Sequence, residues 1–267
     1  MDRGTIIGVV LVVILLLLTI LLQVNFVVTD AFFIFDFASI VLVLGGTMCS
    51  ALISVPFERF VLSLKATRVV FSPPKLDPAE AINQIVGLAN TARKEGVLAL
   101  EDSVAAMDDE FLKKGIMLIV DGTDPELVKG IMETELSYIE ERHTDIAGTY
   151  DLMGAFAPAW GMTGTLIGLI MMLLDLDIDT IGPNMGLALI TTLYGTIIAN
   201  AWAMPFASKL KQVNKEEMLL KTVLIEGMLS IQAGENPRII EEKLKSFLAP
   251  TMRGDVGAPQ SLGGVEA

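Results

Sequence analysis

The sequence predicts an all-α integral membrane protein with four transmembrane helices and a large cytoplasmic helical domain. Hydrophobic residues make up 52% of the chain and charged residues 19%, and the mean hydropathy is +0.61. A soluble domain carries about one quarter charged residues. Runs of about 20 apolar residues are long enough to cross a bilayer. The predicted spans are residues 4–24, 37–55, 149–174 and 185–206.

The positions of the basic residues predict the orientation of these spans. The short connections 25–36 and 175–184 contain aspartates but no Lys or Arg. All 19 basic residues lie before the first span, between the second and third, or after the fourth. By the positive-inside rule, both termini and residues 56–148 are cytoplasmic. A signal peptide is a weaker interpretation of the first run, which is longer than a usual h-region and lacks an A-x-A cleavage site.

Residues 56–148 are too many for a turn and enough for a compact helical unit. Residues 57–71 alternate apolar and basic positions, which is typical of a helix lying on an anionic membrane surface. The Asp-Pro pairs at Asp77 and Asp124 predict that helices begin there.

The cytoplasmic tail, residues 207–267, is also predicted to be helical at first. Residues 214–248 are amphipathic, with a break at a Gly-Glu-Asn-Pro sequence. From about residue 251 the chain is rich in Gly and poor in large apolar groups, so we expect disorder.

Composition excludes several classes of function. The net charge of −13 argues against nucleic-acid binding on electrostatic grounds. Cys49 and His143 are the only cysteine and histidine, so no metal site and no cofactor are expected. The sequence has no nucleophile–base set and no phosphate loop in a soluble context, so we do not expect an enzyme.

The third span has glycines on one helical face. Gly161, Gly164 and Gly168 are three and four residues apart, which lets another backbone approach closely. Thr165 lies on or beside that face.

The fourth span carries hydroxyl groups at a matching spacing. Thr192, Thr196 and Asn200 recur every four residues, and Thr191 and Gly195 form the adjacent ridge. Hydroxyls can coordinate a cation or hydrogen-bond a carboxylate, but they are not titrating proton sites. The stretches 154–174 and 185–206 contain no charged residue, so we expect an ion path whose charge comes from another chain.

Several motifs along most of the chain are specific in their order and spacing. They are Ala92-Arg93-Lys94-Glu95-Gly96, Leu98-Ala99-Leu100-Glu101, Asp121-Gly122, Ala157-Pro158-Ala159-Trp160-Gly161-Met162, Gly164-Thr165-Leu166-Ile167-Gly168-Leu169-Ile170, Thr191-Thr192-Leu193-Tyr194-Gly195 and Met204-Pro205-Phe206. With the predicted topology, they resemble the MotA/PomA family, the ring-forming subunits of the bacterial flagellar stator.

The resemblance implies a homopentamer in the bacterial inner membrane around a dimer of a single-span MotB/PomB-type partner. That partner would supply the ion-binding aspartate, and the cytoplasmic domain would pass torque to the rotor protein FliG. Arg93 and Glu101 match the residues that engage the rotor. Pro158 and Pro205 match prolines that relay ion occupancy, and a plain helix kink or boundary is the alternative.

The sequence leaves open which ion is coupled, and it leaves a second class of related ring-forming protein as an alternative. Thr165, Thr191 and Thr192 look more like the sodium-driven branch than the proton-driven one, and Thr196 extends the same path. A threonine can also simply bond the carbonyl four residues back in its own helix. The alternative class is an ExbB/TolQ-type energiser, although those proteins have three spans and an outer N-terminus.

Overall fold

The computed structural model describes residues 2–23, 34–105, 107, 109–174, 178–248, 250 and 253. Within these ranges every regular element is a helix, and four helices are long and apolar enough to cross a membrane. The predicted fold class is therefore confirmed. The expected disorder from about residue 251 concerns residues that, apart from Arg253, lie outside those described.

The chain divides into two compact units. One comprises Met1–Pro74 and Arg142–Val213, and we call it the membrane unit because it contains the apolar spans. The other, which we call the helical unit, comprises Lys75–Glu141 and Asn214–Ala267.

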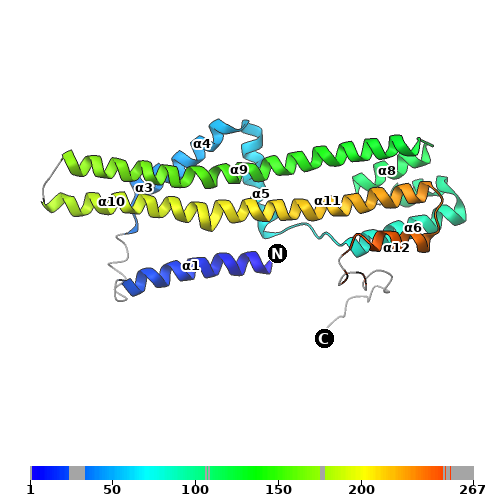
Figure 1. The fold of residues 1–267 in the computed structure, drawn as a ribbon, viewed down its shortest axis with the longest axis horizontal. Helices are drawn as coiled ribbons and strands as arrows, with labels where there is room; N and C mark the ends of the chain where they lie inside the picture. The colour runs from blue at the N-terminus through cyan, green and yellow to red at the C-terminus, as the bar shows by residue number, and fades with distance from the viewer. Residues whose placement is uncertain are drawn as a thin grey trace. The chain divides into compact units, whose positions relative to one another are not determined.

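The first two candidate spans of the membrane unit differ in regularity. Helix α1 (Arg3–Gln23) is a single α-helix. The second span consists of α3 (Phe37–Ile40), the π-helix η2 (Val41–Gly45) and α4 (Gly46–Ser54) without a break (Figure 1). Asp36 caps α3, because its carboxylate accepts a hydrogen bond from the Ser39 backbone N–H at 2.6 Å.

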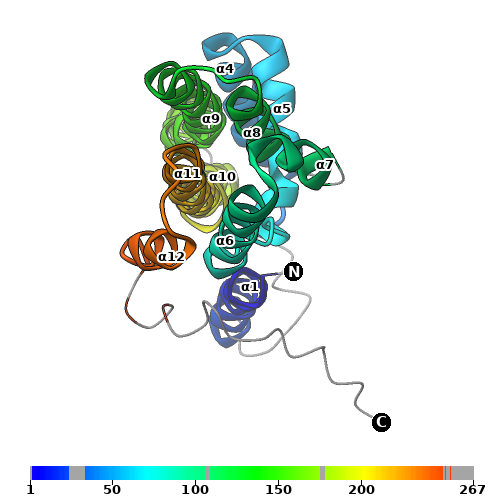
Figure 2. The ribbon, with the colours of Figure 1, turned by 90° about the vertical axis from the view of Figure 1, so that its right-hand side faces the viewer.

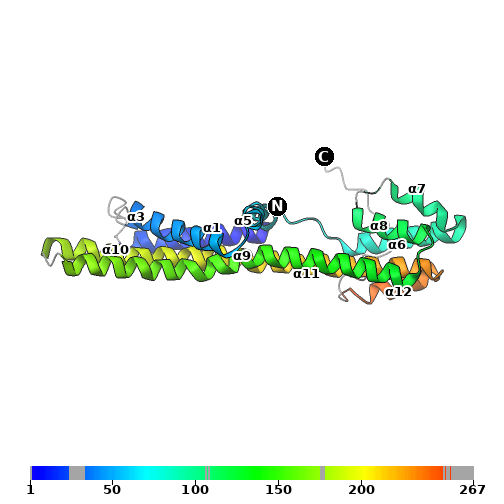
Figure 3. The same ribbon diagram turned by 90° about the horizontal axis from the view of Figure 1, so that it is seen from above.

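The third and fourth candidate spans are parts of longer helices. The predicted span 149–174 is the apolar end of α9 (Pro125–Leu174). The predicted span 185–206 runs through α10 (Ile178–Ile197), the π-helix η4 (Ile198–Ala203) and the start of α11 (Met204–Gln232). In the membrane unit, α9 and α10 lie side by side (Figures 1 and 3).

Helix α5 (Phe57–Phe71) is the amphipathic segment expected at a membrane surface. Its inner side is held to α9: the Tyr150 hydroxyl donates to the Ser63 carbonyl at 2.9 Å and hydrogen-bonds the Thr67 hydroxyl at 2.7 Å. An ion pair joins Arg59 to Asp145 at 2.5 Å. Phe57, with 66% of its surface exposed, is among the large apolar side chains of α5 left uncovered in this chain.

The helical unit contains α6 (Pro78–Glu95), the short 3-10 helix η3 (Val97–Ala99), α7 (Leu100–Ala105), α8 (Glu110–Val120) and α12 (Pro237–Lys245), with parts of α9 and α11. Helices α6, α11 and α12 are adjacent (Figure 2). Asp77 caps α6 by accepting from the backbone N–H groups of Ala79 and Glu80 at 2.9 and 3.3 Å. The core of this unit is aliphatic, with Ile82, Leu112, Ile116 and Leu244 fully buried.

Candidate functional site

The glycines of the third span lie where α10 comes closest to α9. A Cβ added at Gly164 would lie 2.6 Å from Thr191 Cβ, and one at Gly168 would lie 2.9 Å from Ala188 Cβ. At Gly161 it would lie 3.0 Å from the Thr191 carbonyl oxygen. Real Cβ contacts are essentially never shorter than 3.0 Å, so Gly164 and Gly168 admit only glycine at this helix separation, and Gly161 lies at the limit.

Gly195 plays the same part from the other helix. A Cβ there would lie 2.5 Å from the Ala157 carbonyl oxygen. Glycines on both helices therefore bring two backbones, with their carbonyl groups, into direct contact in the span.

This close approach brings together four oxygen atoms, which we call the oxygen cluster: Thr165 Oγ1, Thr192 Oγ1 and the carbonyl oxygens of Gly161 and Ala188. Thr165 Oγ1 lies 3.1 Å from Gly161 O and 3.0 Å from Ala188 O, and it hydrogen-bonds the Thr192 hydroxyl. Thr192 Oγ1 lies 3.4 Å from Gly161 O. Both threonines are half-buried.

The oxygen cluster suits a hard cation. Hydroxyl and carbonyl oxygens can replace part of the hydration shell of an ion. The two hydroxyls supply two protons for four oxygens, so lone pairs remain available for an ion. None of the four groups titrates, so the cluster carries no charge of its own.

The other two predicted path residues lie outside the cluster. Thr191 is buried over Gly164, and its hydroxyl donates to the Ala188 carbonyl at 2.8 Å. Thr196 is exposed, and its hydroxyl donates to the Thr192 carbonyl of its own helix at 2.8 Å. The structure thus brings Thr165 and Thr192 together, while Thr191 shares an acceptor with Thr165.

The two predicted coupling prolines lie on neighbouring helices. Pro158 precedes Thr165 in the third span, and Pro205 follows Thr192 at the end of the fourth span. Pro158 lies inside α9 and does not end it, whereas Pro205 lies where η4 gives way to α11. A Cβ added at Gly154, one turn before Pro158, would lie 3.0 Å from Met204 Cγ. A proline lacks the N–H that its helix needs, so each helix has a weakened turn at this level.

Aromatic rings fill the region next to Pro205. Phe206 packs against Trp202 and Tyr150, with ring centroids 6.1 and 6.0 Å apart, and its ring also contacts Phe71 of α5 at 5.5 Å. A change in the helix bend at Pro205 would therefore displace side chains that contact both α5 and α9.

Arg93 and Glu101 lie in the helical unit on either side of one tight reversal. Arg93 is exposed in the last turn of α6, and Glu101 is exposed in the first turn of α7. Gly96, with φ of 92°, makes the reversal, and the fully buried Leu100 anchors it. Two charges of opposite sign are thus held on a fixed surface.

Two contacts that the sequence did not suggest fix the second span to this site. The Trp160 indole N–H donates to Ser50 Oγ at 2.9 Å, and a Cβ at Gly46 would lie 2.2 Å from the Trp160 ring. The Gly45-Gly46 pair was the available signal for this contact.

The second contact involves Tyr194, two residues from Thr192 in α10. The Tyr194 hydroxyl donates to the Ile34 carbonyl and accepts from the Asp36 backbone N–H at 3.2 Å. Two residues advance about 3 Å along a helix axis but turn by about 200°, so the second span begins near the level of Thr192 on a different face of α10. The Asp36 carboxylate caps α3 by accepting from the Ser39 backbone N–H, and it is not one of the groups of the oxygen cluster.

In the part of the chain that is described, no group of three His, Cys, Asp or Glu side chains could hold a metal ion. Fold and site together define a multi-pass helical membrane protein whose third and fourth spans pack through glycines around uncharged oxygens.

Comparison with known proteins gives the family. Residues 103–222 match the model of the MotA/TolQ/ExbB proton channel family. Motility protein A of Borreliella burgdorferi is 46% identical over 68% of this chain and 70% of its own length. Chemotaxis protein PomA of Vibrio alginolyticus is 39% identical over 80% of this chain and 84% of its own.

A solved structure agrees with these relatives. The fold matches a chain in the structure of the flagellar MotAB stator complex from Bacillus subtilis, with a TM-score of 0.86 and 33% identity, over 96% of this chain and 100% of that chain. The chain belongs to the MotA/PomA family. These relatives are motility proteins and not enzymes, which confirms that expectation.

Proposed function

We propose that this chain is the ring-forming subunit of a flagellar stator that couples cation flow to rotation. The relatives that carry motility names and the match to a stator complex support this function. The distribution of basic residues supports an inner-membrane location with both termini in the cytoplasm, the outer face of α5 being in contact with membrane lipid.

The oxygen cluster supports the need for a partner. It offers ligands but no charge, so a carboxylate has to be added before a cation is held strongly. A MotB/PomB-type single-span dimer within a pentamer of this chain would bring one aspartate at a time to the clusters around the ring. Binding and release of the ion at that aspartate would then turn the ring.

We propose sodium as the coupling ion in preference to the proton. The observation that carries this choice is the convergence of two hydroxyls and two carbonyls, which are the oxygen types that replace a hydration shell. A proton path would need only the carboxylate and a hydroxyl relay, and would not require four converging oxygens.

The experiment compares Thr165→Ala and Thr192→Ala with Thr165→Ser, and measures swimming speed across sodium concentrations at constant pH and ionic strength. A lost ligand contributes about 1 kcal/mol, which corresponds to about a fivefold higher sodium concentration at half-maximal speed. Thr165→Ser keeps the hydroxyl and should stay near the wild type.

Thr196→Ala is the control, because Thr196 is exposed and bonded to its own helix. Unchanged motility of both cluster variants at every sodium concentration would remove the sodium role. A speed that follows the proton gradient and ignores sodium would favour the proton instead.

The prolines support a route from the ion to the rotor. Pro158 and Pro205 weaken α9 and α11 at one level, and Phe206 contacts α5 there. We propose that ion occupancy changes the bend at this level. The change would move the cytoplasmic surface that carries Arg93 and Glu101 against FliG.

A further inference from the structure

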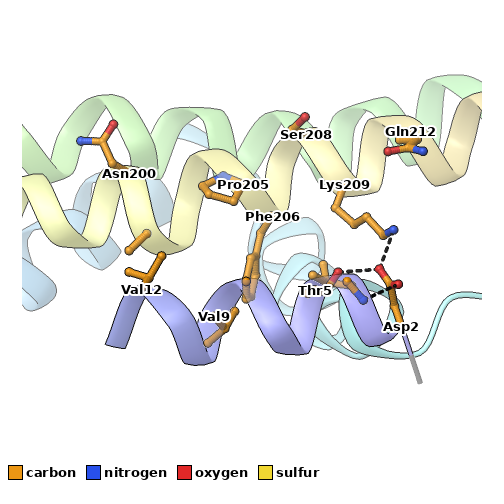
Figure 4. Close-up of a pocket in the computed structure, with 14 residues that line it drawn as sticks. Asp2, Thr5, Val9, Val12, Asn200, Pro205, Phe206, Ser208, Lys209 and Gln212 are labelled. Atoms are coloured by element: carbon orange, nitrogen blue, oxygen red, sulfur yellow. Dashed lines mark hydrogen bonds and ion pairs between the residues drawn. The ribbon is translucent and has the colours of Figure 1, made fainter. Parts of the chain in front are cut away.

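A cavity of about 560 Å³ lies between α1 and the first turns of α11 (Figure 4). This volume is within the range of about 300–1,000 Å³ that is usual for small-molecule sites. The α1 side is formed at every fourth residue, by Gly4, Gly8 and Val12, with Thr5 and Val9 beside them. One face of the N-terminal half of α1 therefore lines the cavity.

One end of the cavity is charged. The Lys209 ammonium lies 2.7 Å from the Asp2 carboxylate, and the Thr5 hydroxyl donates to the same carboxylate at 2.6 Å (Figure 4). The Asp2 backbone N–H donates to the Phe71 carbonyl at 2.9 Å, which fixes this end to α5. Hydrogen bonding from Lys209 lowers the pKa of Asp2 to about 2, so the carboxylate is ionised at physiological pH.

The other end is apolar and open. Val9, Val12 and Phe206 line it together with Asn200, whose amide N–H donates to the Thr196 carbonyl, and a Cβ added at Gly8 would have no atom within 4 Å. This end extends along α1 in the direction of the span, away from the charged end where the helix begins. The cavity is therefore amphipathic, with its polar end at a membrane surface and its apolar end at the depth of acyl chains.

A space of this kind inside a bilayer is filled by a lipid or by protein. The charges at the polar end indicate which lipid. Lysine has three N–H donors and uses one for Asp2, and the carboxylate keeps free lone pairs. A headgroup with both a phosphate and an ammonium can satisfy Lys209 and Asp2 together, whereas a phosphoglycerol headgroup would offer the Asp2 carboxylate only hydroxyl groups and no positive charge.

We propose that this cavity binds one phospholipid with a zwitterionic phosphoethanolamine headgroup. The phosphate lies at Lys209, the ammonium lies at Asp2, and one acyl chain runs along Val9, Val12 and Phe206. The site requires only that the chain spans a membrane, and it does not depend on which ion drives the motor. Because Pro205 and Phe206 also line the cavity, the lipid touches the turn that the proposed function uses for coupling.

The test measures phospholipid retained by the purified complex. The complex, with its partner, is purified in mild detergent, incubated with an equimolar mixture of phosphatidylethanolamine and phosphatidylglycerol, washed, and examined by native mass spectrometry. We expect one phosphatidylethanolamine per copy of this chain. Gly8→Trp fills the open end and should reduce retention at least tenfold.

The matched control is Val10→Trp, on the same helix but not among the residues that line the cavity, and it should retain the lipid. Asp2→Asn removes the partner of the ammonium and should abolish the preference over phosphatidylglycerol. Equal retention of the two lipids by the wild type would overturn the headgroup assignment.

Two further results would overturn the site itself. One is unchanged retention in Gly8→Trp when the complex still assembles. The other is efficient disulfide formation between Gly8→Cys of two copies, which would show that a neighbouring chain fills the space. Lipid retention is measured without motility, so its failure leaves the stator function standing, and loss of that function leaves the lipid site standing.

Discussion

Gly164 shows how a single residue sets the geometry of the oxygen cluster. Thr191 lies over it, and this contact sets the distance between α9 and α10 at which Thr165 reaches Thr192 and Ala188. A larger residue would push the helices apart and lengthen those contacts. The geometry of the oxygen cluster and the packing of the two spans therefore depend on the same position.

Gly164→Ala is expected to destabilise the membrane unit and to reduce motility. The new Cβ would lie 2.6 Å from Thr191 Cβ and 2.7 Å from Thr191 Oγ1, and overpacking of this kind costs about 1–3 kcal/mol. Thermal unfolding of the purified complex, measured alongside swimming speed, checks this. Gly148→Ala is the control, because a Cβ at Gly148, also in α9, meets no atom within 4 Å. Equal behaviour of the two variants would show that the close approach at Gly164 is unimportant.

The spacing of residues along the sequence predicted the glycine face of the third span, but it could not predict which side chains of the neighbouring helices contact it. Glycines at intervals of three and four indicate a close-packed face, because that follows from the helix repeat alone. Thr191 and Thr192 are adjacent, however, and only the rotation of α10 decides which of them points to Thr165. The contacts of Trp160 and Tyr194 with the second span depend in the same way on distant neighbours. The functional roles of the four threonines stay predictions.

At the scale of the helices, the Tyr150 hydroxyl is one of the groups that hold α5 to the rest of the membrane unit, beside the ion pair of Arg59 with Asp145. Tyr150 joins α9 to the Ser63 carbonyl and the Thr67 hydroxyl, and its ring packs near Phe206 beside Pro205. A change in the bend at Pro205 can therefore reach the surface helix directly. This link could not be predicted, since a tyrosine at the start of a span is usually read as an interface anchor.

Tyr150→Phe is expected to loosen α5 while leaving the rest of the fold intact. The change removes one or two hydrogen bonds of a buried hydroxyl, which contribute about 1 kcal/mol each, and leaves the Ser63 side of α5 less firmly held. Hydrogen exchange of the α5 amides should rise by about fivefold. Tyr138→Phe is the matched control, because Tyr138 of α9 has 67% of its surface exposed. Identical exchange in the two variants would mean that the hydroxyl does not hold α5.

The sequence predicts a helix boundary where a local side chain caps the helix. It does not predict a boundary that depends on packing against distant residues. Asp77 and Asp124 precede α6 and α9 because an aspartate before a proline satisfies the free N–H groups of the first turn. The π-helices η2 and η4 have no such local signal. Asp109 does cap α8, yet the sequence around it gave only a run of charges and no helix start.

At the scale of the whole molecule, the uncharged oxygen cluster lies in the membrane unit and the charged pair Arg93 and Glu101 lies in the helical unit. Residues 154–174 and 185–206 contain no charged residue, whereas Arg93 and Glu101 are exposed in the helical unit. In the proposed function, the ion binds in the membrane unit and the helical unit contacts the rotor. Stability and torque should then respond separately to changes in the two charges.

Reversing both charges, with Arg93→Glu and Glu101→Lys in one chain, is expected to reduce torque severely and to leave the fold and the partner complex unchanged. Both side chains are exposed, so the free energy of unfolding should change by less than about 0.5 kcal/mol. In the proposed function, Arg93 and Glu101 attract residues of the rotor. Complementary charges set the encounter and register of two surfaces, so a reversed pair should repel those residues. The double change is used because neighbouring charges can compensate for a single one.

Stall torque of tethered cells measures the effect, and co-purification of the single-span partner measures assembly. Lys129→Glu with Glu133→Lys is the matched control, since this exposed pair lies one turn apart on α9 in the same unit. Reversal of the opposing charges on FliG should restore torque to the Arg93 and Glu101 variant but not improve the wild type. Normal torque in that variant, or a loss equal to the control's, would show that the rotor is engaged elsewhere on the helical unit.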